Sequence, residues 1–349
     1  MKLNISIGIL AYNEANLINE TLQSLSNQSI FKDSELDWDI EVIVVPNGCT
    51  DNTQEVAQTA LEKLILSETI KKQFSWKICE LSLAGKARAW NAYVHEFSNS
   101  VANYLILMDA DIKFIEETAL RNLILALETN FDAHISTDKP VKDVLLKSNR
   151  NLIEHLSALA SGVSGAADDE VWICGQLYCA RAPMLRRITI PLGVEMDDGY
   201  LWEMIVTDML TTSRNFKRVV RAKDASHIFQ AYTDLKKLLS HEKWLIISDT
   251  VNSFVFDYLK SSNFIGEELS LKIQRNNEFN PDWVEDLVQA RISSMGRWVI
   301  PNWFLYRRFK SLNNHSFFKL IWMFPIAFMA FIMDIYISTL ANSALHRKA

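Results

Sequence analysis

Short apolar runs alternate with helical patterns through the first third of this 349-residue chain, and this alternation constrains its fold more than any other feature. Strands are expected at residues 4–10, 40–45, 76–81 and 104–108, with amphipathic helices between them at 15–27, 53–66 and 86–98. This order is typical of a parallel sheet whose right-handed crossover helices cover both faces. We therefore predict an α/β fold with a Rossmann-like, mostly parallel sheet flanked by helices.

Polar side chains follow the expected strands at the points where those strands end. Tyr12, Asn13 and Glu14 come after the first run, Asn47 comes after the second, and Asp109 comes after the fourth. Ligands of open parallel sheets bind beyond the carboxyl ends of the strands. We therefore expect these side chains to meet at one edge of the sheet.

Two carboxylates, Asp109 and Asp111, stand two positions apart at the end of the fourth apolar run. Because strand side chains alternate between faces, both carboxylates should point to the same side. Neighbouring carboxylates repel each other, and a divalent cation that holds a diphosphate is the usual reason to place them together. A solvated loop with two acidic residues is the alternative when the pair is taken alone.

Composition narrows the class of function. The chain has 49% hydrophobic residues, which supply a large core, and its length suits one large domain or two. Its net charge of −6 argues against a nucleic-acid partner, since no basic field is available to neutralise phosphates. The four cysteines lack the paired spacing of a zinc site and suit a reduced, cytosolic setting.

Four segments in succession resemble the motifs of family 2 glycosyltransferases with the GT-A fold. They are residues 7–14, 44–53, 85–91 and 108–111. Their order and spacing match over residues 3–115, and weaker matches continue to about residue 245. The resemblance implies a nucleotide-sugar donor, Mg²⁺ or Mn²⁺ as cofactor, and transfer with inversion at the anomeric carbon of the sugar.

The resemblance also implies a division of the chain. Residues 1–115 would form the nucleotide-sugar-binding half of a GT-A domain, and residues 116–260 would form its acceptor-binding and catalytic half. Residues 261–349 would form a helical C-terminal region.

The donor contacts are expected in the first half of the chain. The resemblance places Ala11, Tyr12, Asn13, Glu14 and Asn47 around the base and ribose. The family usually has Asp-Asp-Gly-Ser in the second loop, whereas this chain has Pro-Asn-Gly-Cys, which removes two carboxylates. A UDP-sugar is the first expectation for the donor, and a simple tight turn is the alternative for Asn47 and the glycine after it.

A cation and a metal site are expected next to the base and ribose. Lys86 follows a glycine at the start of a helix, where backbone N–H groups favour an anion, so it should reach the diphosphate. Asp111 is the main candidate metal ligand, and Asp109 should help it and contact the donor. GT-A enzymes often use a histidine as a third metal ligand, and His227 is the candidate for that ligand. An exposed lysine and a histidine packed in a loop are the alternatives.

An acidic pair, Asp197 and Asp198, precedes a helical pattern and resembles the pair whose second member is the catalytic base in this family. A base is needed because a sugar hydroxyl is a poor nucleophile until its proton is taken. Asp198 is favoured over Asp197, and capping of the helix is the alternative for either. Residues 240–244 keep only the tryptophan and a basic residue of the Gln-x-x-Arg-Trp motif of processive synthases, which favours transfer of single sugars.

The C-terminal segment at 317–341 is expected to associate with a membrane. Residues 320–333 carry no polar side chain, although Asp334 ends this run short of the roughly 20 residues that a span needs. The aromatic residues just upstream resemble an interfacial belt: Trp298, Trp303, Phe304 and Tyr306. The segment would span the membrane or lie on it, with catalysis at the cytoplasmic face and a glycan or lipid-linked acceptor. A buried helix is the alternative.

An inverting, metal-dependent glycosyltransferase is therefore the predicted function, and two other classes stay open. A sugar-1-phosphate nucleotidyltransferase would need a glycine-rich arginine loop after the first strand, where this chain has Ala-Tyr-Asn-Glu at 11–14. A non-catalytic binding or scaffold protein on the same fold is the other alternative, because the loop at 46–49 has lost its carboxylates.

Overall fold

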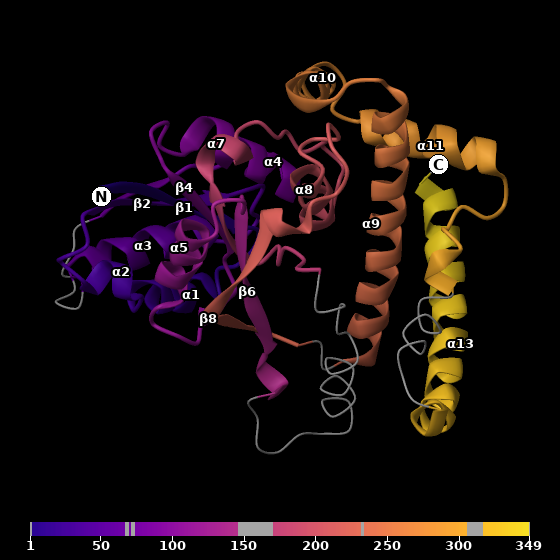
Figure 1. Cartoon of the computed structure of the whole chain (residues 1–349), viewed down its shortest axis with the longest axis horizontal. Coiled ribbons are helices and arrows are strands. Elements are labelled where there is room, and N and C mark those ends of the chain that lie inside the picture. The colour runs from indigo at the N-terminus through magenta and orange to yellow at the C-terminus, as the bar shows by residue number, and fades with distance from the viewer. Residues whose placement is uncertain are drawn as a thin grey trace. The chain divides into compact units, whose positions relative to one another are not determined.

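The computed structural model describes residues 2–66, 70, 74–145, 170–231, 234–305 and 317–348, and in the last of these segments the side chains of residues 328–347. The chain divides into two compact units (Figure 1). The first comprises Met1–Ala231 and Phe264–Phe279, and the second comprises Tyr232–Asn263 and Asn280–Ala349.

A single sheet forms the centre of the first unit, and among the described residues its strand order is β3-β2-β1-β4-β7-β6-β8-β5 (Figure 1). The strands are β1 (Leu3–Ala11), β2 (Trp38–Pro46), β3 (Ser75–Ile78), β4 (Tyr104–Asp109), β5 (Lys113–Phe114), β6 (Ile135–Lys142), β7 (Leu177–Arg181) and β8 (Val219–Phe229). The four strands β1 to β4 run parallel, as predicted. β7 then pairs antiparallel with both β4 and β6, so the second half of the sheet is mixed.

Helices flank this sheet on both faces (Figure 1). Those of the first unit are α1 (Ile18–Ser26), α2 (Ser29–Lys32), α3 (Thr53–Ile65), α4 (Lys86–Ala92), the π-helix η1 (Tyr93–Phe97), α5 (Ala119–Thr129), the 3₁₀ helices η2 (Asp143–Leu145) and η3 (Phe216–Arg218), α7 (Ala182–Leu185), α8 (Asp197–Val206) and α10 (Gly266–Phe279). The second unit contains α9 (Leu235–Ser261), α11 (Trp283–Met295) and α13 (Phe317–Lys348). The three predicted crossover helices are present as α1, α3 and α4 with η1.

The centre of the first unit is closely packed where η1 crosses β1. A Cβ atom at Gly8 would lie 2.5 Å from the nearest ring carbon of Tyr93. The hydroxyl of Tyr93 donates a hydrogen bond to the Oγ of Ser6 at 3.0 Å, which satisfies both buried polar groups. Glycine at position 8 therefore allows the tyrosine ring to lie against the strand.

The sequence from Arg218 to Ala222 indicates a short strand, but β8 extends beyond it to Phe229. Asp224 adopts a left-handed φ of 51°, and the register with β6 shifts between Thr137 and Lys139, but pairing resumes and the strand continues to Phe229. His227 consequently lies inside a strand, whereas the alternative to its metal role was a histidine packed in a loop. It pairs with Phe114 of β5, and this pairing fixes the position of its backbone.

The second unit has its own core, to which α9, α11 and α13 contribute. On α13 the buried side chains include Asp334, Ile337, Ser338 and Ala341, spaced for one helical face. The carboxylate that interrupts the apolar run therefore faces the protein interior.

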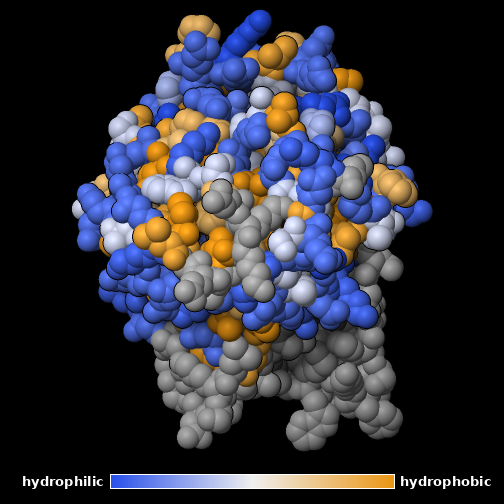
Figure 2. Space-filling model, turned by 90° about the vertical axis from the view of Figure 1, so that its left-hand side faces the viewer, coloured by the Kyte–Doolittle hydropathy of each residue, from blue (hydrophilic) through white to orange (hydrophobic). Residues whose placement is uncertain are grey.

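The opposite side of α13 is apolar and exposed. It carries Phe328, Met329, Ile332, Met333, Ile335, Tyr336 and Leu340. Phe328–Arg347 is long and apolar enough to cross a membrane, and 28% of it is buried within the protein. On the face of the molecule in Figure 2, by contrast, apolar residues occur singly or in small groups among hydrophilic ones.

The predicted aromatic belt is only partly exposed. Trp298 and Trp303 are exposed, whereas Phe304 is buried in the core of the second unit. Tyr306 lies outside the described residues. The term belt therefore fits two of the four aromatic residues.

Candidate active site

Asn47 holds the loops after β1, β2 and β3 together. Its Nδ2 donates to the carbonyl of Ala11 at 2.8 Å, and its Oδ1 accepts from the backbone N–H of Gly85 at 3.1 Å. The side chain is only 3% exposed, so these bonds are shielded from water. The amide of Asn47 therefore links neighbouring loops by donating one hydrogen bond and accepting another. Its contact with a base stays a prediction.

The segment after β1 is fixed by the loop after β2. Asn13 has a left-handed φ of 56°, and its Oδ1 accepts from the backbone N–H of Thr50 at 2.7 Å. The N–H of Glu14 donates to the Oγ1 of Thr53 at 2.8 Å. The ring of Tyr12 stays 52% exposed at this edge and is available to a ligand.

Negative charge accumulates beyond β1 and β4. Burial, followed by the charges of Asp111 and Asp109, raises the pKa of Glu14 to about 7. Burial and the charge of Asp109 likewise raise the pKa of Asp111. A divalent cation would relieve this repulsion, and carboxylate oxygens are ligands that Mg²⁺ and Mn²⁺ accept. Carboxylate chemistry therefore suits the predicted metal, and its binding by Asp109 and Asp111 stays a prediction.

Lys86 is a fixed cation beside these carboxylates. Its Nζ lies 3.1 Å from Oδ1 of Asp109 and 3.8 Å from Oδ1 of Asp197, and it donates to the carbonyl of Gly175 at 3.1 Å. Burial by itself would lower the pKa of Lys86, but the charges of Asp109 and Asp197 raise it above the ordinary value. The lysine is therefore charged, and the structure brings it together with residues from both halves of the chain.

The two aspartates at the start of α8 have different surroundings. Asp197 is 6% exposed and faces Lys86, and burial raises its pKa to about 6 against the opposing effect of the lysine. Asp198 is less buried and accepts from the N–H of Gly199 at 2.8 Å, and burial raises its pKa as well. α8 begins at Asp197, so both aspartates lie in its first turn, and neither is the N-cap residue, which is Met196.

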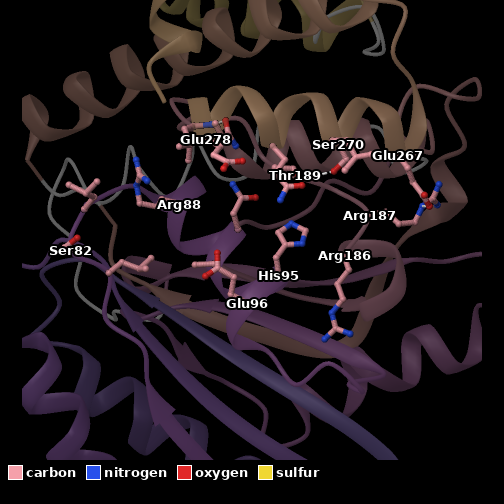
Figure 3. A pocket seen from close by; sticks show the side chains of 18 residues that line it. Ser82, Arg88, His95, Glu96, Arg186, Arg187, Thr189, Glu267, Ser270 and Glu278 are labelled. Atoms are coloured by element: carbon pink, nitrogen blue, oxygen red, sulfur yellow. Dashed lines mark hydrogen bonds and ion pairs between the residues drawn. The ribbon is translucent and has the colours of Figure 1, made fainter. Parts of the chain in front are cut away.

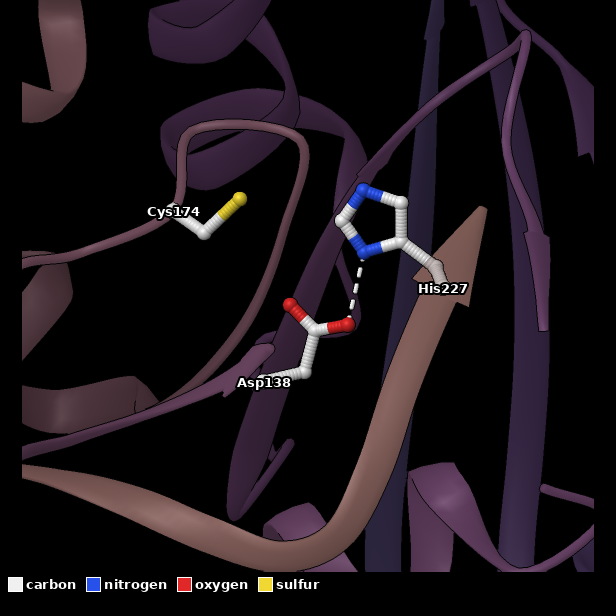
Figure 4. A group of neighbouring side chains, drawn as sticks. All are labelled: Asp138, Cys174 and His227. Carbon is white, nitrogen blue, oxygen red and sulfur yellow. Dashed lines mark hydrogen bonds and ion pairs between the residues drawn. The ribbon is translucent and has the colours of Figure 1, made fainter. Parts of the chain in front are cut away.

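His227 is held by a carboxylate that sequence analysis does not identify (Figure 4). Its Nδ1 lies 2.6 Å from Oδ2 of Asp138, and both side chains are fully buried. A carboxylate at Nδ1 keeps the proton there and leaves Nε2 with a free lone pair. Nε2 faces Oε1 of Gln176 at 3.2 Å, and the amide orientation of that glutamine would follow the tautomer.

A group of potential metal ligands lies around this histidine. Asp138, Cys174 and His227 have ligand atoms within 4.8 Å of one another (Figure 4). Burial raises the pKa of the Cys174 thiol to about 12, so the thiol is neutral. Asp111 and Asp109 are not members of this group, so their sharing of a metal with His227 stays a prediction.

The segment at 174–176 contacts both halves of the site. The carbonyl of Gln176 accepts from the N–H of Asp109 at 2.9 Å. A Cβ atom at Gly175 would lie 3.1 Å from Cβ and Oδ2 of Asp198. Sequence reasoning misses most of this segment because the segment contributes backbone groups and a close approach of two segments. Neither produces an acidic or basic motif in the sequence.

A separate cavity of about 800 Å³ lies elsewhere in the first unit (Figure 3). Its lining includes Arg88, His95, Thr189 and Ser270, and Thr189 and Ser270 hydrogen bond to each other at 2.8 Å. None of the predicted site residues lines it. The candidate active site is instead the exposed edge of the sheet.

Comparison with known proteins finds a family model that matches the first part of the chain. Residues 6–159 match the model described as glycosyl transferase family 2. A mannosyltransferase from Pyrobaculum calidifontis, solved with GDP-Man and Mn²⁺, is 16% identical with a TM-score of 0.55, over 97% of this chain and 86% of that chain. This likeness shows a shared fold.

A glucosyl-3-phosphoglycerate synthase from Mycobacterium tuberculosis is also similar. It was solved with Mn²⁺, uridine-diphosphate-glucose and phosphoglyceric acid, and is 15% identical with a TM-score of 0.44. The match covers 72% of this chain and 79% of that chain.

Proposed function

We propose that this chain is a family 2 glycosyltransferase that transfers a sugar from a nucleotide-sugar to an acceptor hydroxyl, with inversion and with Mn²⁺ or Mg²⁺ as cofactor. One observation carries the proposal. The carboxylates after β4, the cation at the start of α4 and the aspartates at the start of α8 converge through Lys86, which contacts Asp109 and Asp197. Each group comes from a different segment, and together they supply the charges that this reaction needs.

The donor would lie across the carboxyl ends of β1, β2 and β4. We assign the metal to Asp111 and Asp109, with Nε2 of His227 as a further ligand. When bound, a divalent ion supplies positive charge to the departing diphosphate. Lys86 adds a second positive charge at the same place, and because it is already held by Asp109 it needs little reorganisation to act.

Asp198 is the proposed general base. It would take the proton of the acceptor hydroxyl while that oxygen forms its bond to the anomeric carbon and the bond to the diphosphate oxygen breaks. The nucleoside diphosphate leaves, and attack from the opposite face inverts the anomeric centre. The raised pKa of Asp198 supports this role, since a stronger base accepts a proton more readily. Asp197 is nearer Lys86 and more buried, so it is the less suitable base.

A membrane-presented acceptor is the further part of this proposal. The exposed side of α13 is apolar along much of the described helix, while its polar residues Asp334 and Ser338 face inward. We propose that this side contacts lipid at the cytoplasmic face of a membrane and that the acceptor is a glycan or a lipid-linked sugar. The donor is proposed to be a UDP-sugar, with GDP-mannose, which the Pyrobaculum calidifontis enzyme was solved with, as the main competitor.

Thermal melting against nucleotide-sugars, with Mn²⁺ or with a chelator, tests the donor site directly. A ligand that binds the native state alone raises the melting temperature. The proposal expects a metal-dependent rise with one class of nucleotide-sugar, loss of that rise in Asp111→Asn, and an unchanged rise without turnover in Asp198→Asn. A well-folded protein that responds to none of them would be the non-catalytic scaffold instead. Normal turnover of Asp198→Asn would move the base elsewhere.

A further inference from the structure

An exposed tryptophan is mounted on the helix that carries the proposed base. Trp172 stacks on Trp202 of α8 with ring centroids 4.1 Å apart and an angle of 12° between planes. Trp202 is buried, whereas the indole of Trp172 remains 45% exposed. One face of Trp172 is thus used inside the protein, and the remaining indole surface is available to a ligand.

The stack beneath Trp172 is fixed by further contacts. Trp202 stacks on Phe216 at 5.8 Å, and the guanidinium of Arg214 lies 5.6 Å from the centre of a Trp202 ring. The indole N–H of Trp202 donates to the carbonyl of Val171 at 2.9 Å, which ties the helix to the residue before Trp172. A rigid aromatic surface loses little conformational entropy when a ligand covers it.

The position of Trp172 relative to the base follows from two contacts. Residues 198 and 202 are about one turn apart on the same face of α8, a separation of about 6 Å along the axis. Gly175 packs against Asp198 and Trp172 packs against Trp202, so the segment at 172–175 runs beside this face in the opposite direction. The same short segment therefore contacts both the helical turn of the proposed base, through Gly175, and the next turn, through Trp172.

We propose that Trp172 is the platform for the acceptor and that the acceptor is a sugar, whose apolar C–H face stacks on the indole. An acceptor that covers the indole would extend along residues 172–175 toward Gly175, which packs against Asp198. Flat aromatic surface combined with a few polar groups is how proteins hold ligands that are apolar on one side and polar at the edge. This inference rests on the proposed function and names the acceptor class for that site.

The test uses the full chain and the nucleotide-sugar that raises its melting temperature. Methyl glycosides of glucose, mannose and galactose serve as acceptor probes, and glycerol and phosphoglyceric acid serve as non-sugar acceptors. Trp172→Ala should raise the KM for an active glycoside about tenfold, with kcat and donor hydrolysis changed by less than about twofold. Trp172→Phe should show a smaller rise because it keeps a flat ring.

Two controls separate a sugar platform from a structural role. Trp172→Leu keeps apolar bulk over Trp202 but has no flat face. If Trp172 is a platform, the KM of the leucine variant should equal that of the alanine variant. If Trp172 is only structural, the KM of the leucine variant should equal that of the wild type. Phe131→Ala removes an aromatic side chain that is 85% exposed after α5 and should change nothing.

Several results would overturn the assignment. An unchanged KM in Trp172→Ala would do so, as would transfer to glycerol or phosphoglyceric acid but to none of the glycosides. Donor hydrolysis that no glycoside competes with would also contradict it. Because donor melting shifts and donor hydrolysis are measured in the same proteins, failure of the platform is distinguishable from failure of the proposed function.

Discussion

The bond between Asp138 and His227 permits a sharp prediction about metal affinity. Replacing Asp138 with asparagine keeps the shape of the side chain but removes its charge and gives His227 a second possible partner, an amide N–H. If that N–H faces Nδ1, the ring proton moves to Nε2, and the nitrogen that should bind the metal is blocked. The 2.6 Å contact is fully buried, so water cannot restore the lost partner.

The expected loss follows from this geometry. Second-sphere changes of this kind lower metal affinity by about 10- to 100-fold, and the burial of both partners puts Asp138→Asn towards the upper end, at about 2 to 3 kcal/mol. Mn²⁺ binding measured by calorimetry and by the electron paramagnetic resonance signal of free Mn²⁺ gives the affinity without turnover.

Cys174→Ser is the matched control for Asp138→Asn. Cys174 lies in the same group of side chains but is not the partner of Nδ1, so its substitution should change Mn²⁺ affinity by less than about threefold. His227→Ala should lose at least as much affinity as Asp138→Asn. Equal Mn²⁺ affinity in wild type and Asp138→Asn would refute the orienting role, and equal affinity in His227→Ala would remove the histidine from the metal site.

Three further perturbations test other parts of the structure. In chelator, the raised pKa of Glu14 means that the folded state binds more protons than the unfolded state between about pH 4.5 and 7, so ionisation destabilises the fold as pH rises. Glu14→Gln should therefore raise the melting temperature more at about pH 8 than at about pH 5, and an equal effect at both would contradict the shift. Gly8→Ala should lower the free energy of unfolding by about 1–3 kcal/mol in urea, since its Cβ would lie 2.5 Å from Tyr93, and a neutral result would mean that the ring moves freely. Replacing Met329 and Ile332 of α13 with serine should weaken sedimentation with anionic liposomes, whereas serine at the exposed Leu125 of α5 should not.

The parallel half of the sheet is predictable from sequence because three of its strands, β1, β2 and β4, are mostly apolar runs. Such a run is buried on both faces, and polar residues mark its end, as Asp109 does for β4. Tyr93 shows the limit of the pattern, since the helix predicted to continue through it becomes π-helical where it packs on Gly8. Local periodicity carries no information about that contact.

The second half of the site is harder to predict because long-range pairing decides it. β7 lies between β4 and β6, and this antiparallel insertion brings Gln176 beside Asp109. Asp224 has a positive φ inside β8, and its sequence neighbourhood does not indicate that the strand continues. His227 therefore resembles a loop residue in the sequence. A lone aspartate such as Asp138 gives no signal until its partner is known.

The short segment before β7 explains why neither half of the chain completes the site without the other. The carbonyl of Gly175 accepts from Lys86, the carbonyl of Gln176 accepts from the N–H of Asp109, and the side chain of Gln176 faces His227. A side chain at position 175 would press on Asp198. Glycine at this position therefore allows the segment to lie close to the proposed base while its carbonyl accepts from Lys86. Because the same backbone supports donor charges and the proposed base, a displacement of this segment would alter both together.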